Sequence, residues 1–337
     1  MSLIPSRSTI VFKKGRTVMV LFKEAMVQQM FRRRLILRWL STAVAVIFGL
    51  TTPFLRIELG LSNSVVVIYS VVLGVSVMAA SYVSKQFSDR LGSRPLVFFS
   101  SLFSLFFFMA WVLITKNVNP IWFFVLGFFT NFFVALISLL TFRLVAQVMP
   151  DDETVAFNSM VNFVIAIIAF FVGIFSGFLA DKGEIARNLF VLDGKAAGNG
   201  YTLVFLFAIA LTMIETLVAS RLQEVGAYSS QEAAQVIFSM HGIRAVSMIE
   251  KLERTSDPAK RRFLMLSLGE NFNNLATSEL RQILASPFSP DKLEAVRTLA
   301  DRPRKSLLDD LIKVARDDDS YVQLDAIAAL GSYRKEV

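Results

Sequence analysis

Six long runs without a charged residue dominate the first two thirds of this chain. They cover Trp39–Leu55, Leu59–Ser84, Pro95–Thr115, Asn117–Phe142, Thr154–Ala180 and Ala196–Ile214. A helix of about 20 apolar residues crosses a bilayer core about 30 Å thick. The runs are continuously apolar, and strands of a membrane barrel would alternate instead. The pattern therefore predicts an all-α protein with six transmembrane helices within residues 35–225. Arg38 and Arg56 are expected to snorkel from the ends of the first helix, and the last helix is expected to continue past Glu215 to Ser220.

Basic residues are unevenly distributed around these runs. Residues 1–34 form a basic segment that ends in Arg32, Arg33 and Arg34, and part of it, Val18–Phe31, is either an amphipathic helix on the inner leaflet or a linker helix. Because Lys and Arg concentrate in cytoplasmic loops, we predict that both termini are cytoplasmic and that residues 181–200 lie outside. The net charge of +8 is interpreted as this bias, which makes the lipid bilayer the expected partner and nucleic acid not a partner.

The stretch KQFSDRLGSRP, Lys85–Pro95, is the polar turn between the second and third runs. Gly92 can adopt a left-handed conformation without a Cβ clash, and Pro95 is suited to the first turn of a helix. The carboxylate of Asp89 is suited to a helix N-terminus or to an arginine.

This turn resembles the signature loop of the major facilitator superfamily, which runs Gly-x-Leu-Ala-Asp-Arg-x-Gly-Arg-Arg. Asp89, Arg90, Gly92 and Arg94 match it, whereas Lys85, Phe87 and Ser93 depart from it. The resemblance extends over about residues 18–225 and includes the Pro-Phe-Leu of the first run and the segment Met149–Phe163. It implies that Asp89, with Arg90 or Arg94, latches neighbouring helices in one access state. The alternative is a tight turn with cytoplasmic charges and no switching role.

The resemblance implies transport of a small-molecule substrate by alternating access. Members of the superfamily have two six-helix repeats with the substrate between them, and this chain resembles the C-terminal one. Either a second six-helix half, in the same or a different chain, completes the carrier, or the sequence is a fragment of a longer protein. A bacterial cytoplasmic (inner) membrane is the expected location.

Polar residues inside the predicted helices are candidates for a cavity or for bonds between helices, because polar groups are expensive in lipid. They are Asn131 and Arg143 in the fourth helix, Asn158 and Asn162 in the fifth, and Glu215 in the sixth. Arg143 and Glu215 either form a pair or separately reach the headgroups and a cytoplasmic network. Gly173 and Gly177 form a small-residue face on the fifth helix that allows close packing.

Residues 229–337 have the character of a soluble helical domain. Helix pairs recur with a period of 31, which places Leu268, Leu299 and Leu330 in register. Such a period is typical of an α-solenoid, and the last pair resembles a HEAT repeat. This cytoplasmic domain either contacts a protein or is a passive cap. The corresponding alternative function is a membrane-anchored scaffold whose tail recruits a cytoplasmic protein.

Signatures of enzymes are missing from the sequence. It contains no cysteine and one histidine, His241, and neither a phosphate-binding glycine loop nor a nucleophile elbow is apparent. We therefore expect no catalytic residues, no metal site and no cofactor.

Overall fold

The computed structural model describes residues 23, 26–114, 118–149, 154–183, 185, 191–192, 195–196, 199–222, 224, 228–255, 257–269, 274–287 and 289–333. The chain divides into two compact units, Pro5–Ala227 and Tyr228–Val337, the second of which also includes Met1–Ile4. Half of the predicted helix Val18–Phe31 lies outside the described residues.

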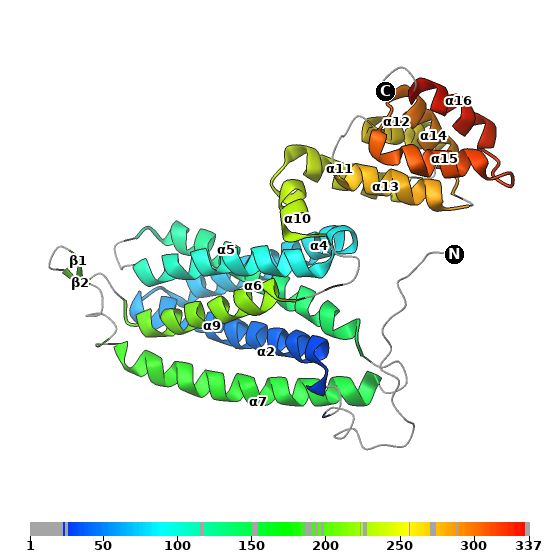
Figure 1. Ribbon diagram of the computed structural model, residues 1–337. Coiled ribbons are helices and arrows are strands. Elements are labelled where there is room, and N and C mark those ends of the chain that lie inside the picture. Colours follow the sequence, from blue (N-terminus) through cyan, green and yellow to red (C-terminus); the bar gives the residue numbers. More distant parts are fainter. Residues whose placement is uncertain are drawn as a thin grey trace. The chain divides into compact units, whose positions relative to one another are not determined.

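Six helices of the first unit are long and apolar enough to cross a membrane, as the sequence predicts. Five are the helices α4 (Asn63–Leu91), α5 (Ser93–Leu113), α6 (Pro120–Ala146), α7 (Thr154–Asp181) and α9 (Thr202–Ser220). The remaining span, Gln29–Glu58, is the first in chain order. It is composed of α2 (Gln29–Gly49), α3 (Thr51–Pro53) and the π-helix η1 (Phe54–Glu58). A short antiparallel hairpin of β1 (Val191–Leu192) and β2 (Lys195–Ala196) precedes α9 (Figure 1).

The first helix begins ten residues earlier than the charge-free run Trp39–Leu55 indicates. Arg38 therefore lies inside the helix, and its placement at the helix end was wrong. The physical reason is that Arg34 and Arg38 donate hydrogen bonds to backbone carbonyls within the bundle. Arg34 Nη1 donates to Leu144 O at 2.9 Å and Arg38 Nη1 donates to Ser138 O at 3.0 Å.

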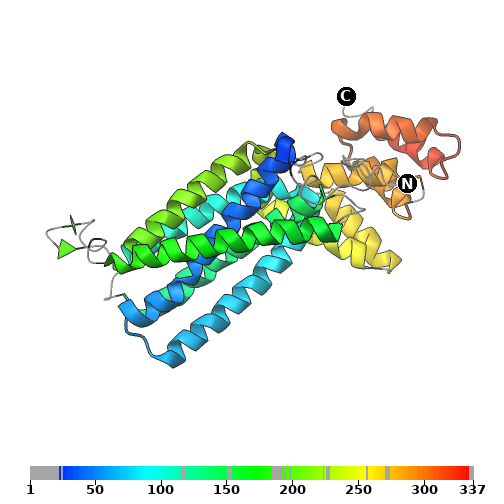
Figure 2. The same ribbon diagram turned by 90° about the horizontal axis from the view of Figure 1, so that it is seen from below.

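Two of the six helices are peripheral. In the most apolar window of each span, 17% of α4 and 6% of α7 are buried, against 39–44% for the other four. Helix α4 packs mainly on α6, whereas α7 packs on α2 and less on α9. Helix α7 accordingly runs along one edge of the bundle in Figure 1 and lies in front of the other helices when the bundle is seen from below (Figure 2). The outward faces of α4 and α7 are thus left open in this chain.

An aromatic cluster closes the end of the bundle nearest the hairpin, called the hairpin end here. The Phe54 ring makes edge contacts with the rings of Trp111, Tyr201 and Phe205. The indole Nε1 of Trp111 donates to the Thr130 hydroxyl at 3.0 Å. These contacts tie η1, α5, α6 and α9 together, and the opposite end, which contains Gly92, is called the turn end.

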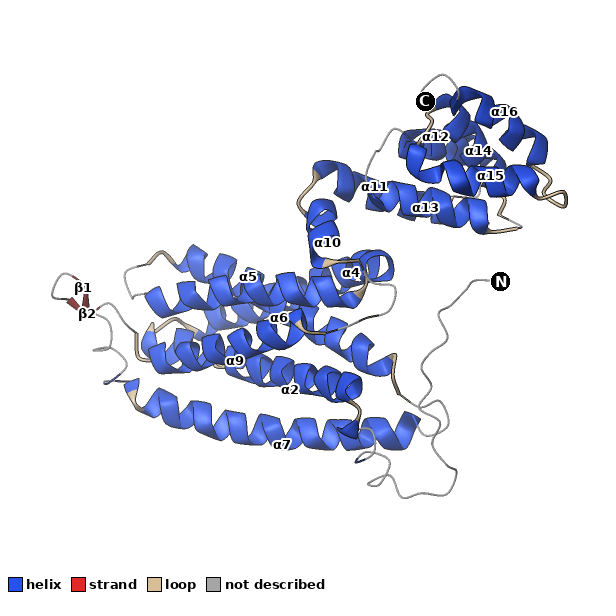
Figure 3. Cartoon of the chain, viewed as in Figure 1, coloured by secondary structure: helices blue, strands red, loops and turns tan. Residues whose placement is uncertain are grey.

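The second unit consists of helix pairs, as the repeat predicts (Figure 3). Helix α10 (Ser230–Ile237) precedes three pairs: α11 (Met240–Arg254) with α12 (Pro258–Gly269), α13 (Asn274–Ala285) with α14 (Lys292–Asp301), and α15 (Leu308–Arg316) with α16 (Gln323–Tyr333). The 3-10 turn η2 (Lys305–Leu307) precedes α15. Leu268 and Leu299 are buried at equivalent positions, and Leu330 is half-buried. Successive pairs pack through their second helices, α12, α14 and α16, and through their first helices.

Candidate functional site

The turn between α4 and α5 depends on Gly92. Its backbone has φ of 85° and ψ of 164°, a conformation that is essentially restricted to glycine. The Gly92 N–H donates to Ser88 O at 3.2 Å, which ends α4, and α5 begins at the next residue. The turn therefore brings the last turn of α4 and the first turn of α5 to the same end of the bundle.

Asp89 pairs with Arg143 across this end. Arg143 Nη1 lies 2.5 Å from Asp89 Oδ1 and also donates to the Ser88 hydroxyl. The pair joins α4 to α6. The Asp89 side chain is 56% exposed and the Arg143 side chain is 39% exposed. The alternative in which Arg143 pairs with Glu215 is wrong. Arg143 instead supplies the arginine that the sequence analysis considered for Asp89.

The first turn of α5 is held by an acid that the sequence analysis missed. Glu224 Oε2 accepts the Arg94 backbone N–H at 2.8 Å, and Arg94 Nη2 reaches Ser220 O at 3.4 Å. Glu224 Oε1 accepts from Gln147 Nε2 at 3.4 Å. A carboxylate just after the last span, near the free N–H groups of α5, is favoured by the helix dipole. That placement is the signal that sequence analysis could have used.

Arg34 belongs to the same network and was also missed. Its side chain is 5% exposed, and Nη1 contacts Gln147 Oε1 at 3.5 Å in addition to the Leu144 carbonyl. Arg90 is half-buried in the last turn of α4. The turn end thus links α2, α4, α5, α6 and the segment after α9 through charged side chains.

The other predicted polar residues lie at separate places. Asn131 Nδ2 donates from α6 to Leu73 O at 2.9 Å and to the Ser76 hydroxyl at 2.7 Å, both on α4. These are hydrogen bonds between helices. On α7, Asn158 is half-buried and Asn162 is exposed.

Gly173 and Gly177 lie on the open part of α7. Among the described atoms, nothing lies within 4 Å of a Cβ built at either glycine. Helical spacing places both glycines on the same face as Asn162. The close packing predicted for this small-residue face therefore has no counterpart within the described chain, and it stays a prediction about another helix.

Glu215 is fully buried in α9, and neither carboxylate oxygen has a hydrogen-bond partner among the described residues. Hydroxyl groups join the neighbouring helices on both sides. Ser41 and Thr141 are 3.1 Å apart between α2 and α6, and Thr216 donates to Ser101 at 3.0 Å between α9 and α5. A polar layer therefore crosses an otherwise apolar core.

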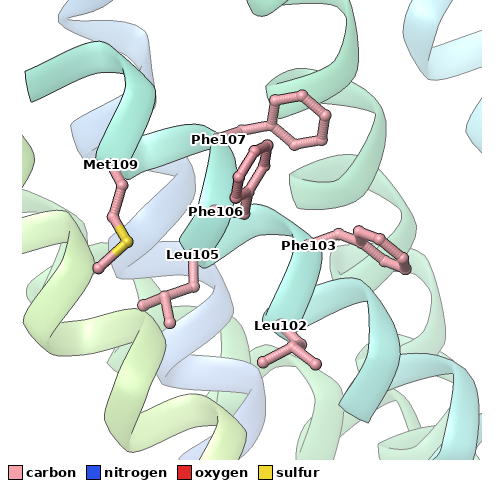
Figure 4. A pocket seen from close by; sticks show the side chains of 6 residues that line it. All are labelled: Leu102, Phe103, Leu105, Phe106, Phe107 and Met109. Atoms are coloured by element: carbon pink, nitrogen blue, oxygen red, sulfur yellow. The ribbon is translucent and has the colours of Figure 1, made fainter. Parts of the chain in front are cut away.

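A surface hollow of about 530 Å³ lies on α5 (Figure 4). Its lining is entirely apolar: Leu102, Phe103, Leu105, Phe106, Phe107 and Met109. The Phe103 and Phe107 rings stack on Phe133 and Phe129 of α6, respectively. Without polar groups to orient a solute, this hollow is suited to lipid chains.

Two family models match the chain. A model described as Major Facilitator Superfamily matches residues 5–174, just over half of the 337 residues, and this match includes the Asp89 turn and Arg143. A model described as HEAT repeats matches residues 277–337, which contain α14 to α16 and most of α13. A search of curated proteins found no match.

Proposed function

Because the chain belongs to the Major Facilitator Superfamily, we propose that it moves a small solute across its membrane by alternating access, as the C-terminal six-helix half of a carrier. The family is one of membrane transporters, and the six apolar spans make the chain an integral membrane protein. In such carriers the substrate lies at the interface between two repeats. The solute pathway is therefore proposed between this bundle and a second six-helix half.

The observation that carries the proposal is the open outward face of each of α4 and α7, the two least buried spans. The open face of α7 combines Asn162 with Gly173 and Gly177, and glycines allow another helix to approach closely. Exposed apolar side chains surround them, including Phe163 and Phe170. A second half, supplied by another copy or another chain, would cover this face and give the asparagines a cavity or a partner.

The Asp89–Arg143 pair is proposed as the latch of one access state. It joins α4, whose outward face is open, to α6 at the turn end. A rocking motion that displaces α4 at this end has to break the pair. The latch is therefore a contact made in one state and lost in the other, which is the condition for biasing such an equilibrium.

We also propose that the turn end faces the cytoplasm of a bacterial inner membrane. Lys85 and Arg90 lie in the last turns of the second span and Arg94 in the first turn of the third, and further arginines begin the first span. This bias is the one expected of cytoplasmic segments. Because the chain has no cysteine, Lys85→Cys and Lys182→Cys variants each carry one thiol. An impermeant maleimide applied to intact cells should label Lys182→Cys and spare Lys85→Cys, and the reverse pattern would invert the topology.

Photo-crosslinking tests the second half. Gly173→Cys, which has open space around it, is labelled with benzophenone maleimide in native membranes and illuminated. We expect a protein adduct, either with another copy or with a different membrane protein. The matched control is Phe106→Cys in the lipid-facing hollow of α5, which should give lipid adducts. Equal protein adducts from both sites would count against an interface at α7.

Uptake tests transport itself. The chain is reconstituted with the partner that crosslinking identifies and exposed to a panel of labelled small solutes. Accumulation of one class above that of empty vesicles is the expected result. If the complete assembly moves none of them, the transport proposal fails, whatever the crosslinking result.

The scaffold remains a second candidate because of one feature of the helical tail. Helices α12 and α16 expose Phe263, Leu266, Leu324 and Ile327, and exposed apolar groups of this kind mark contact surfaces. In the full-length protein, a Phe263→Ser, Leu324→Ser double variant should lose crosslinks to a soluble protein while uptake is retained. Unchanged crosslinks would exclude this surface.

A further inference from the structure

Glu215 is an ionisable group without a hydrogen-bond partner among the described residues. It lies five residues before the end of α9, about 8 Å along the helix axis, within the span Thr202–Ser220. The side chain has no exposed area, and both oxygens lack hydrogen bonds to described residues. An ionised carboxylate in such a place is strongly destabilising, and the usual outcome is that the group becomes neutral.

The surroundings of Glu215 follow from the register of the helices. Helices α5 and α9 run in opposite directions, and the Thr216–Ser101 hydrogen bond of 3.0 Å places Glu215 at the level of Ser101. Arg33 Nη1 donates to Arg221 O at 2.9 Å. Measured from that contact toward the hairpin end, Ser41 lies about 12 Å away along α2, and Glu215 lies about 9 Å away along α9. Glu215 and Ser41 therefore lie within about one helical turn of the same level.

This level contains hydroxyls that already have partners. Ser41 bonds to Thr141 and to Arg38 O, while Thr216 bonds to Ser101 and to Thr212 O. The Ser104 hydroxyl, one turn along α5 from Ser101, is buried without a described partner. The layer can accommodate a neutral carboxylic acid, which is both a donor and an acceptor. The cation nearest to this layer, Arg38, donates to Ser138 O, which also accepts from the Thr141 hydroxyl, and among the described residues no hydrogen bond joins Arg38 to Glu215.

Most charged groups on the helices packed against α9 contact other residues, and Arg32 of α2 is exposed. On α2, Arg33, Arg34 and Arg38 donate to Arg221 O, Leu144 O and Ser138 O, respectively. On α5, Arg94 donates to Ser220 O. On α7, Asp181 ends the helix at the opposite, hairpin end. Within α9 itself Glu215 is the single ionisable residue.

A metal ion is less suited to this position than a proton. Among the described residues there is no group of three or more acidic or histidine side chains that could hold a metal. A sodium ion would need several oxygen ligands, and the hydroxyls at this level are mostly bonded to one another or to carbonyls. A proton needs one oxygen of Glu215.

We propose that Glu215 is a proton-binding site of the bundle. In the packed state described here it is a neutral carboxylic acid, held among α2, α5 and α9. When these helices separate and water enters, the O–H bond breaks, the proton passes to water, and the carboxylate remains. Closure reverses the step and takes up one proton. The site follows from the packing of this chain and does not depend on the proposed transport.

Infrared spectroscopy of the full chain in lipid nanodiscs tests the protonation directly. The wild type at neutral pH should show the carbonyl stretch of a protonated carboxyl group. Glu215→Gln, which keeps the size of the side chain, should remove that band. Glu58→Gln, at the hairpin end, is the matched control and should keep it. If the spectra of the wild type and Glu215→Gln coincide in this region, the proposal is overturned.

Thermal unfolding gives a second readout that does not require the variant to fold. Since the packed state binds a proton that the unfolded chain releases at neutral pH, the melting temperature of the wild type should fall as pH rises. In Glu215→Gln this dependence should be reduced. A wild-type melting temperature that is flat or rises with pH would overturn the proposal. So would stabilisation by sodium that potassium does not reproduce, because it would identify a metal ion as the ligand.

Discussion

Breaking the Asp89–Arg143 pair should shift the access equilibrium by a small factor. Both side chains are partly exposed, at 56% and 39%, and such ion pairs contribute about 0.2–1 kcal/mol. A difference of this size changes a two-state ratio by about 1.4- to 5-fold. We therefore expect Asp89→Asn to move the equilibrium away from the state described here by that factor. The reporter is the rate of maleimide labelling at Ala166→Cys, on the exposed face of α7.

Arg143→Gln should have a larger effect, because Arg143 also donates to the Ser88 hydroxyl. That second bond adds about 0.5–1.5 kcal/mol. The pair itself is isolated by a double-mutant cycle, in which the coupling energy between the two substitutions should equal the contribution of the ion pair. Asp181→Asn at the hairpin end is the matched control and should leave the labelling rate unchanged. A coupling energy of zero, with Asp89→Asn equally effective in both backgrounds, would refute the latch.

Three further predictions concern packing and capping. Arg304→Met should destabilise the helical tail by about 3–5 kcal/mol, because this buried arginine donates to Leu268 O, Gly269 O and Thr277 and its loss leaves carbonyls unpaired. Urea unfolding followed by circular dichroism measures the change in the free energy of unfolding. A decrease below about 1 kcal/mol would contradict the reasoning. Gly127→Ala should lower the melting temperature, because its Cβ would overlap the Tyr69 ring, at a cost of about 1–3 kcal/mol; rescue by a Tyr69→Phe, Gly127→Ala double variant is not expected, since the ring carbons remain. Hydrogen bonds from Ser229 lower the pKa of Glu232, so the capping of α10 should be present at neutral pH and lost as pH falls through that lowered pKa. Amide hydrogen exchange in α10 should accelerate over the same pH range. The Ser229→Ala variant, which lacks the hydroxyl, should show a smaller change of exchange rate with pH.

The six spans were predictable because hydrophobic length is a property of the sequence alone. The bilayer requires a long run without charges, and each run identified in the sequence contains most of one helix. The start of the first span was not predictable in this way. Arg34 and Arg38 look like the end of a hydrophobic segment, yet they lie inside α2 because carbonyl oxygens of α6 accept their hydrogen bonds. Those partners are 100 and 110 residues away along the chain and appear only when the helices pack.

Pairing of charges was harder to predict than their depth. Arg143 and Glu215 occupy similar depths near the turn end, which made them candidates for a pair. In the bundle Arg143 reaches outward to Asp89 while Glu215 faces the core. Depth follows from position in the sequence, but the rotation of each helix about its axis follows from the packing of all its neighbours. The tail was more accessible to prediction because its period of 31 repeats the same local packing.

Backbone geometry explains why one acid differs from the others in this bundle. The last turn of a helix has carbonyl groups without intrahelical partners, and the first turn has such N–H groups. Arginines near the turn end donate to carbonyl groups of this kind, since Leu144 O, Ser220 O and Arg221 O all belong to helix ends. Glu224 accepts from an N–H group of this kind, because it lies at the N-terminus of α5.

Among the described residues, Glu215 has neither kind of partner. It lies inside α9, where the N–H groups of the surrounding helices are already bonded within their own helices, and the terminal nitrogens of Arg33, Arg34 and Arg38 donate to carbonyls. Asp89 is paired with Arg143, and Glu224 accepts a hydrogen bond at the N-terminus of α5. Since no described arginine and no helix N-terminus bonds to Glu215, a proton is the remaining means of neutralising it. The packing that directs the arginines to carbonyl oxygens therefore supports the proposed proton on Glu215.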